Sequence, residues 1–109
     1  MEIDVMTTVW LIEDNDSFRQ NIQRLVASSE GLECEKVFSN CEDAIKELDT
    51  AAAPYLILMD IGLPGIDGIE GVRRIKAIAP SIEVVMLTSF DDNDKIVHAI
   101  CAGASGYLL

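Results

Sequence analysis

The stretch YLILMDIGLPGIDGIEG, residues 55–71, joins an apolar run, an aspartate and a glycine-rich segment. The run from Tyr55 to Met59 is apolar at consecutive positions, which is typical of a strand buried on both faces of a parallel sheet. Glycine then recurs at every third position for only three triplets, which excludes a collagen triple helix. A nucleotide-cradling loop is excluded by the glycine spacing and the lack of lysine. The stretch predicts a buried strand that ends at Asp60 and a tight turn after it.

The same alternation of signals continues on both sides of this stretch. Other short apolar runs, suited to strands, lie at residues 9–12, 32–38, 82–87 and 106–109. Segments with helical spacing lie between the runs, at residues 18–26, 41–48, 67–79 and 93–102. The alternation predicts a doubly wound α/β domain, since parallel strands need right-handed crossovers.

Some side chains of these elements have predictable places. The first helix carries four apolar residues on one face, which is expected to be buried: Phe18, Ile22, Leu25 and Val26. Ser39, with Glu42 three residues later, predicts a capping box at the second helix. Trp10, inside the first apolar run, is expected in the core.

The composition favours one acidic domain. Hydrophobic residues make up 50% of the 109 positions, which is sufficient for a single core. Residues 1–7 are interpreted as an N-terminal leader and residues 8–109 as the domain. Acidic residues outnumber basic ones 19 to 8, and the formal charge of −11 predicts that this segment repels nucleic acid and anionic lipid. Abundant carboxylates suit a divalent cation, which takes oxygen ligands.

The sequence indicates neither export nor a membrane span. The cysteines are odd in number and widely spaced, as for free thiols in a reducing compartment: Cys34, Cys41 and Cys101. No basic-then-apolar leader opens the chain, and Pro54 and Asp60 interrupt the longest apolar stretch. We therefore expect a cytoplasmic protein.

Polar residues follow three of the predicted strands. The first strand ends in Glu13 and Asp14, the third in Asp60, and the fourth in Thr88 and Ser89. Ligands of open α/β sheets bind outside the carboxyl ends of the strands, so these side chains are expected to converge. Three neighbouring carboxylates repel one another, and a bound Mg²⁺ would remove that conflict. The sequence therefore predicts a Mg²⁺ site with room for a phosphate.

A simpler explanation exists for each acid taken singly. Asp14, Asn15 or Asp16 could merely cap the first helix, because aspartate and asparagine are preferred N-cap residues. Because acidic residues follow separate strands that end at the same edge of the sheet, a metal site is the better explanation for these residues taken together.

Four motifs together identify a family resemblance: LIEDN at 11–15, LILMDIGLPGIDGIE at 56–70, VVMLTSF at 84–90 and GASGYLL at 103–109. They resemble the CheY-like receiver domains of two-component response regulators, and the last is most similar to regulators of the LuxR/NarL type. The resemblance spans the chain from about Val9 to Leu109. It implies a five-stranded parallel sheet in the order 2-1-3-4-5.

The resemblance also implies roles for individual residues. Asp60 matches the phosphoacceptor, which receives a phosphoryl group from a sensor histidine kinase. Asp14 and Asp60 match carboxylate ligands of Mg²⁺, Gly62 matches a backbone carbonyl ligand, and Glu13 completes the acidic pair of the metal site. Such a domain is not an enzyme and shows at most slow self-dephosphorylation.

Thr88 and Tyr107 match the switch residues that respond to phosphorylation in the family. The response is expected to control an output domain, which in LuxR/NarL-type regulators binds DNA and regulates transcription. No such output domain lies in this sequence, and the partners expected for the receiver are the kinase and a second copy in a homodimer.

The sequence departs from the family at its end. Members have a lysine after the fifth strand and then a fifth helix, whereas this sequence stops at Leu109, so the domain is expected to be truncated after the fifth strand. Two alternatives remain: a phosphorylation-independent, receiver-like dimerisation module, and an aspartyl-nucleophile phosphatase of the haloacid-dehalogenase type. The phosphatase family has a second aspartate where this chain has Gly62.

Overall fold

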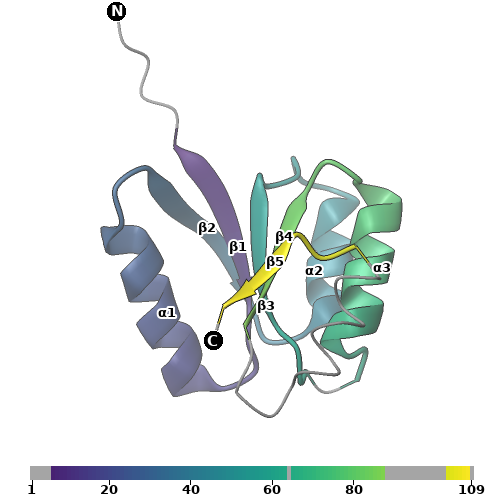
Figure 1. Cartoon of the computed structure of the whole chain (residues 1–109), viewed down its shortest axis with the longest axis horizontal. Coiled ribbons are helices and arrows are strands. Elements are labelled where there is room, and N and C mark those ends of the chain that lie inside the picture. The colour runs from purple at the N-terminus through teal and green to yellow at the C-terminus, as the bar shows by residue number, and fades with distance from the viewer. Residues whose placement is uncertain (1–5, 64, 88–102, 109) are drawn as a thin grey trace, which may run out of the picture.

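Five parallel strands form one sheet in the computed structural model, which describes residues 6–63, 65–87 and 103–108 (Figure 1). The strands are β1 (Thr7–Ile12), β2 (Leu32–Phe38), β3 (Leu56–Asp60), β4 (Glu83–Leu87) and β5 (Gly106–Leu108). The helices are α1 (Asp16–Ser28), α2 (Cys41–Leu48) and α3 (Gly68–Ile78). The strand order is β2-β1-β3-β4-β5, which confirms the predicted doubly wound α/β fold.

The predicted element boundaries agree with the structure to within two residues for the described elements. β1 begins at Thr7, inside the segment interpreted as a leader, because Thr7 and Thr8 pair with Leu32 and Glu33 of β2. The helix expected at 93–102 lies outside the described residues. Among the described residues, no helix has the length and apolar character needed to cross a membrane.

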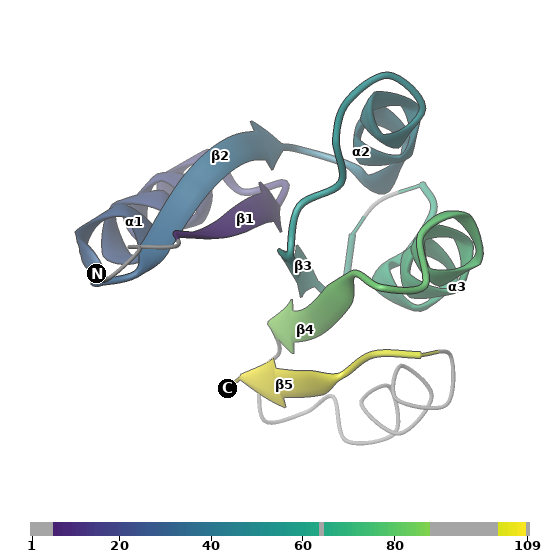
Figure 2. The ribbon, with the colours of Figure 1, turned by 90° about the horizontal axis from the view of Figure 1, so that it is seen from above.

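Helices cover both faces of the sheet, α1 on one side and α2 with α3 on the other (Figure 2). Side chains of β1 alternate between the two layers, as parallel strands buried on both faces require. Val9 and Leu11 pack with Ile22 of α1. Trp10 packs in the opposite core cluster, with no exposed surface, so its predicted core position is confirmed.

Asparagine or aspartate is the N-cap residue of each of the three helices in the described part of the chain. The Asn15 side chain accepts a hydrogen bond from the Phe18 N–H at α1, and Asp67 does the same for the Glu70 N–H at α3. At α2 the N-cap is Asn40, whose Oδ1 accepts from the Asp43 N–H at 2.8 Å, so the predicted Ser39 capping box is wrong by one residue. Serine and asparagine are both good N-cap residues, so residue type alone does not decide between Ser39 and Asn40. The backbone path into α2 decides.

The glycines of residues 62–71 serve different purposes. Gly65 has a φ of +71°, a left-handed conformation that suits glycine in a turn. Gly68 and Gly71 lie inside α3, where an added Cβ would meet neighbouring atoms at 2.5–2.7 Å. The expected turn is therefore shorter than the glycine pattern, because the later glycines permit close packing of α3.

Gly71→Ala is expected to reduce the free energy of unfolding by about 1–2 kcal/mol, although alanine favours a helix over glycine. The new Cβ would lie 2.5 Å from Sγ of buried Cys41. Cys41→Ala removes that sulfur, so the double variant is expected to recover the loss caused by Gly71→Ala, with a coupling of about 1–2 kcal/mol. Urea unfolding of both single variants and the double variant measures the coupling, and additive effects would show that Sγ is not the obstacle.

The apolar face of α1 is only partly covered. Ile22 and Val26 are buried as predicted, but Phe18 is 47% exposed and Leu25 is 66% exposed. These two side chains border an apolar groove of about 520 Å³ between α1 and the sheet. Helical spacing placed all four residues on one face, but their burial depends on which elements pack against that face.

Candidate functional site

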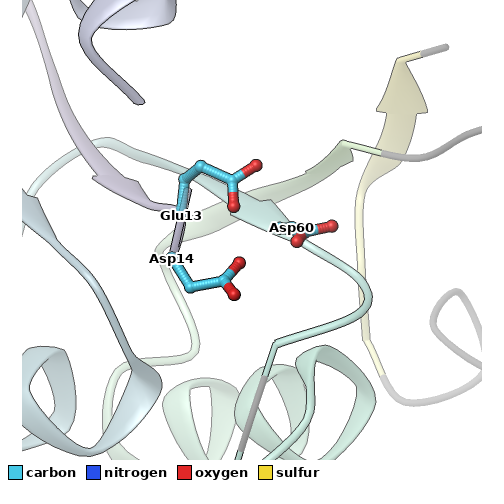
Figure 3. A group of neighbouring side chains, drawn as sticks. All are labelled: Glu13, Asp14 and Asp60. Carbon is cyan, nitrogen blue, oxygen red and sulfur yellow. The ribbon is translucent and has the colours of Figure 1, made fainter. Parts of the chain in front are cut away.

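Three carboxylates meet at the carboxyl ends of β1 and β3 (Figure 3). Glu13 and Asp14 directly follow β1 and Asp60 ends β3; one oxygen from each lies within 4.8 Å of the others. Glu13 is buried, Asp60 is partly buried and Asp14 is exposed. The predicted convergence of these acids is therefore found, and the site opens to solvent on the side of Asp14.

Hydrogen bonds of the β1–α1 turn hold the first two acids. The Glu13 N–H donates to the Phe38 carbonyl at 3.0 Å, which continues the sheet pairing past the end of β1. The Asn15 N–H donates to Oε2 of Glu13 at 3.3 Å. Asn15 caps α1, so Asp14 is not needed as the cap and its carboxylate remains with the cluster.

The segment after β3 positions the third acid. Oδ1 of Asp60 accepts a hydrogen bond from the Gly62 N–H at 3.2 Å. The Ile61 N–H donates to the Leu87 carbonyl at 3.1 Å, and the Gly68 N–H donates to the Ile61 carbonyl at 3.3 Å. A Cβ added at Gly62 would meet no atom within 4 Å. Asp60 is thus anchored between β4 and α3, with open space beside it.

Burial raises the pKa of the Glu13 carboxyl from 4.5 to about 7, with contributions from a hydrogen bond to Asp14 and from the charge of Asp60. Glu13 therefore retains a proton over part of the neutral range when no cation is bound. Mg²⁺ takes hard oxygen ligands and would favour the ionised form of all three acids. Three carboxylate oxygens that lie within 4.8 Å of one another are hard ligands, so the residues present fit a Mg²⁺ site.

In the presence of EDTA, the free energy of unfolding is expected to fall by about 2 kcal/mol on account of Glu13 as the pH rises from about 5.5 to about 8. Between pH 4.5 and about 7 the folded protein keeps a proton on Glu13 that the unfolded chain has lost, so the stabilisation disappears as pH rises. Urea unfolding of wild type and Glu13→Gln across this range isolates the effect. An equal pH dependence in both proteins would contradict it.

Of the two predicted switch residues, only Tyr107 lies among the described residues. Tyr107 lies on β5, paired with Met86 of β4, and is 47% exposed, which is also what an ordinary aromatic residue near a strand end shows. Thr88 lies outside the described residues, as do Ser89 and Cys101. Arg19, in α1, was not singled out by any sequence pattern, yet its side chain donates a hydrogen bond to the Glu13 carbonyl.

Comparison with known proteins agrees with this geometry. The response regulator receiver domain family matches residues 9–109. The chain is 36% identical over 107 residues to the transcriptional regulatory protein LnrK of Bacillus subtilis, covering 95% of this chain and 47% of that protein. It is 34% identical over 103 residues to the response regulator UvrY of Escherichia coli, covering 94% of this chain and 47% of UvrY.

A solved structure of a two-component response regulator of the LuxR family, from Aurantimonas sp. SI85-9A1, superimposes with a TM-score of 0.86. It is 25% identical and covers 94% of this chain and 72% of that one. The chain spans about half the length of the curated relatives named above. It belongs to the response regulator receiver domain family and is related to the receivers of LuxR-family regulators.

Proposed function

We propose that this domain accepts a phosphoryl group on Asp60 from a sensor histidine kinase. A carboxylate oxygen of Asp60 forms the new bond to phosphorus, and the bond between the phosphorus and the kinase histidine breaks. The observation that carries the proposal is the meeting of three carboxylates at the carboxyl ends of β1 and β3, in a chain that belongs to the receiver family.

The acidic residues of the site would have different roles. Asp14, Asp60 and the Gly62 carbonyl would hold Mg²⁺, and Glu13 would complete the acidic pair. Bound Mg²⁺ supplies charge that screens the carboxylates from the incoming phosphoryl oxygens. The Asp60 carboxylate needs no general base because it is already an anion, and the open space at Gly62 leaves room beside it. The domain contributes mainly by positioning, and any self-dephosphorylation is slow.

Phosphorylation would then act as a switch. The added charge at Asp60 would favour one of two arrangements of Thr88 and Tyr107, and so change a surface that pairs with a second copy. In the whole protein, the response would control a DNA-binding output domain and transcription, within the cytoplasm. Relatives named as transcriptional regulators, about twice as long as this chain, support that proposal.

The test is phosphoryl uptake from a small phosphodonor, with Mg²⁺ or with EDTA. The intact mass is expected to increase by one phosphoryl group only with Mg²⁺, and peptide mapping after reduction of the acyl phosphate is expected to identify Asp60. Beryllofluoride, a phosphoryl mimic, is expected to bind under the same conditions. Absence of uptake and of beryllofluoride binding would favour a phosphorylation-independent module, and uptake at another residue would refute the assignment of Asp60.

A further inference from the structure

Arg19 joins the two ends of the turn that carries the acidic residues. It lies in the first turns of α1, and its side chain is 18% exposed. Nη1 donates a hydrogen bond to the backbone carbonyl of Glu13 at 2.9 Å, and Nη2 donates to Oδ1 of Asp16 at 2.6 Å. One guanidinium thus connects the end of β1 to the start of α1, across Asp14.

Arg19 contacts the backbone carbonyl of Glu13. This hydrogen bond therefore fixes the peptide group that joins Glu13 to Asp14. The Glu13 N–H already donates to the Phe38 carbonyl of β2, which ties the same residue to the sheet. A planar guanidinium holds two acceptors in a fixed relative geometry, which a flexible ammonium does not do. Arg19 therefore restricts the direction in which the side chains of Glu13 and Asp14 leave the turn.

The charge of Arg19 is a less important part of this arrangement. The guanidinium is neutralised by Asp16 at 2.6 Å, and an exposed ion pair of this kind contributes little to stability. A purely electrostatic role also predicts the opposite effect on metal binding. Removing a positive charge near three carboxylates would strengthen the binding of a cation, whereas loosening the turn would weaken it.

We propose that Arg19 is a positioning residue for the metal site, holding the turn so that Glu13 and Asp14 face Asp60. The proposal rests on the Mg²⁺ site of the proposed function and goes beyond it by assigning a residue that contributes no ligand. Arg19→Ala is expected to raise the Kd for Mg²⁺ about tenfold, as removal of outer-shell partners of metal ligands does.

The experiment is calorimetric titration of EDTA-stripped protein with Mg²⁺ alone, for wild type, Arg19→Ala, Arg19→Lys and Arg24→Ala. Arg24 is an exposed arginine of the same helix, so Arg24→Ala makes the same change in net charge without touching the turn. Its Kd is expected to stay within about twofold of wild type. The Kd of Arg19→Lys for Mg²⁺ is expected to lie between those of wild type and Arg19→Ala. Lysine keeps the charge but lacks the planar guanidinium that bonds two acceptors at once.

Urea unfolding in EDTA accompanies the titration and shows that each variant is folded. If Arg19→Ala is unfolded, Arg19→Lys carries the comparison, and a Kd equal to that of wild type then overturns the proposal. A Kd for Arg19→Ala that is unchanged or lower than wild type also overturns it, leaving the Mg²⁺ site itself intact. Failure of wild type to bind Mg²⁺ would overturn both this inference and the proposed function.

Discussion

Asp60→Asn is expected to abolish phosphoryl uptake and, at the same time, to stabilise the folded protein. The amide is no nucleophile toward phosphorus, so uptake should fall by at least about 100-fold. Stability should rise by about 1 kcal/mol in EDTA, because one of three neighbouring acids loses its charge. The Asn side-chain carbonyl can still accept the hydrogen bond that Asp60 Oδ1 receives from Gly62. Mass spectrometry of uptake and urea unfolding measure the two effects.

A matched control separates the local effect from the change in net charge. Glu33 is exposed on β2, away from the acidic cluster, so Glu33→Gln removes one negative charge without altering the site. Its free energy of unfolding is expected to stay within about 0.5 kcal/mol of wild type, with normal phosphoryl uptake. Equal stabilisation by both substitutions would mean that global charge, rather than repulsion at the site, is relieved.

The fold was predictable because its strands are apolar at consecutive positions. Val9 to Ile12 and Ile57 to Met59 are buried on both faces, so the run itself indicates a strand of a parallel sheet. The site was predictable for a related reason, since parallel strands bring their carboxyl ends to one edge. Glu13 and Asp60 therefore meet although 46 residues separate them along the chain.

Features that depend on tertiary distance were not predictable. Arg19 contacts a backbone carbonyl six residues earlier, and no residue pattern encodes such a contact. Phe18 and Leu25 share the apolar face of α1 with buried residues, but no described element packs over them fully. The pattern of glycines at residues 62–71 predicted a turn, and only the structure distinguishes the turn residue Gly65 from Gly68, which allows close packing.

Gly68→Ala is expected to be the most destabilising of the substitutions considered, with a loss of about 3 kcal/mol in the free energy of unfolding. An added Cβ would lie 2.7 Å from the Asp60 carbonyl oxygen and 2.8 Å from Cα of Ile61. These are backbone atoms of β3 and its continuation, and they cannot rotate away as a side chain can. The gain of about 1 kcal/mol from the helix propensity of alanine is too small to compensate.

The same substitution is expected to disturb the surroundings of Asp60, because α3 must move away from Asp60 to accommodate the methyl group. The Gly68 N–H donates to the Ile61 carbonyl at 3.3 Å, and that bond would lengthen as the helix withdraws. Gly62→Ala is the control for stability, since its Cβ would meet nothing within 4 Å and is expected to change the free energy by less than about 1 kcal/mol. Urea unfolding of the two alanine variants compares them directly. Equal stability would mean that α3 can withdraw from β3 at no cost, and the close approach at Gly68 would then not explain why this position is glycine.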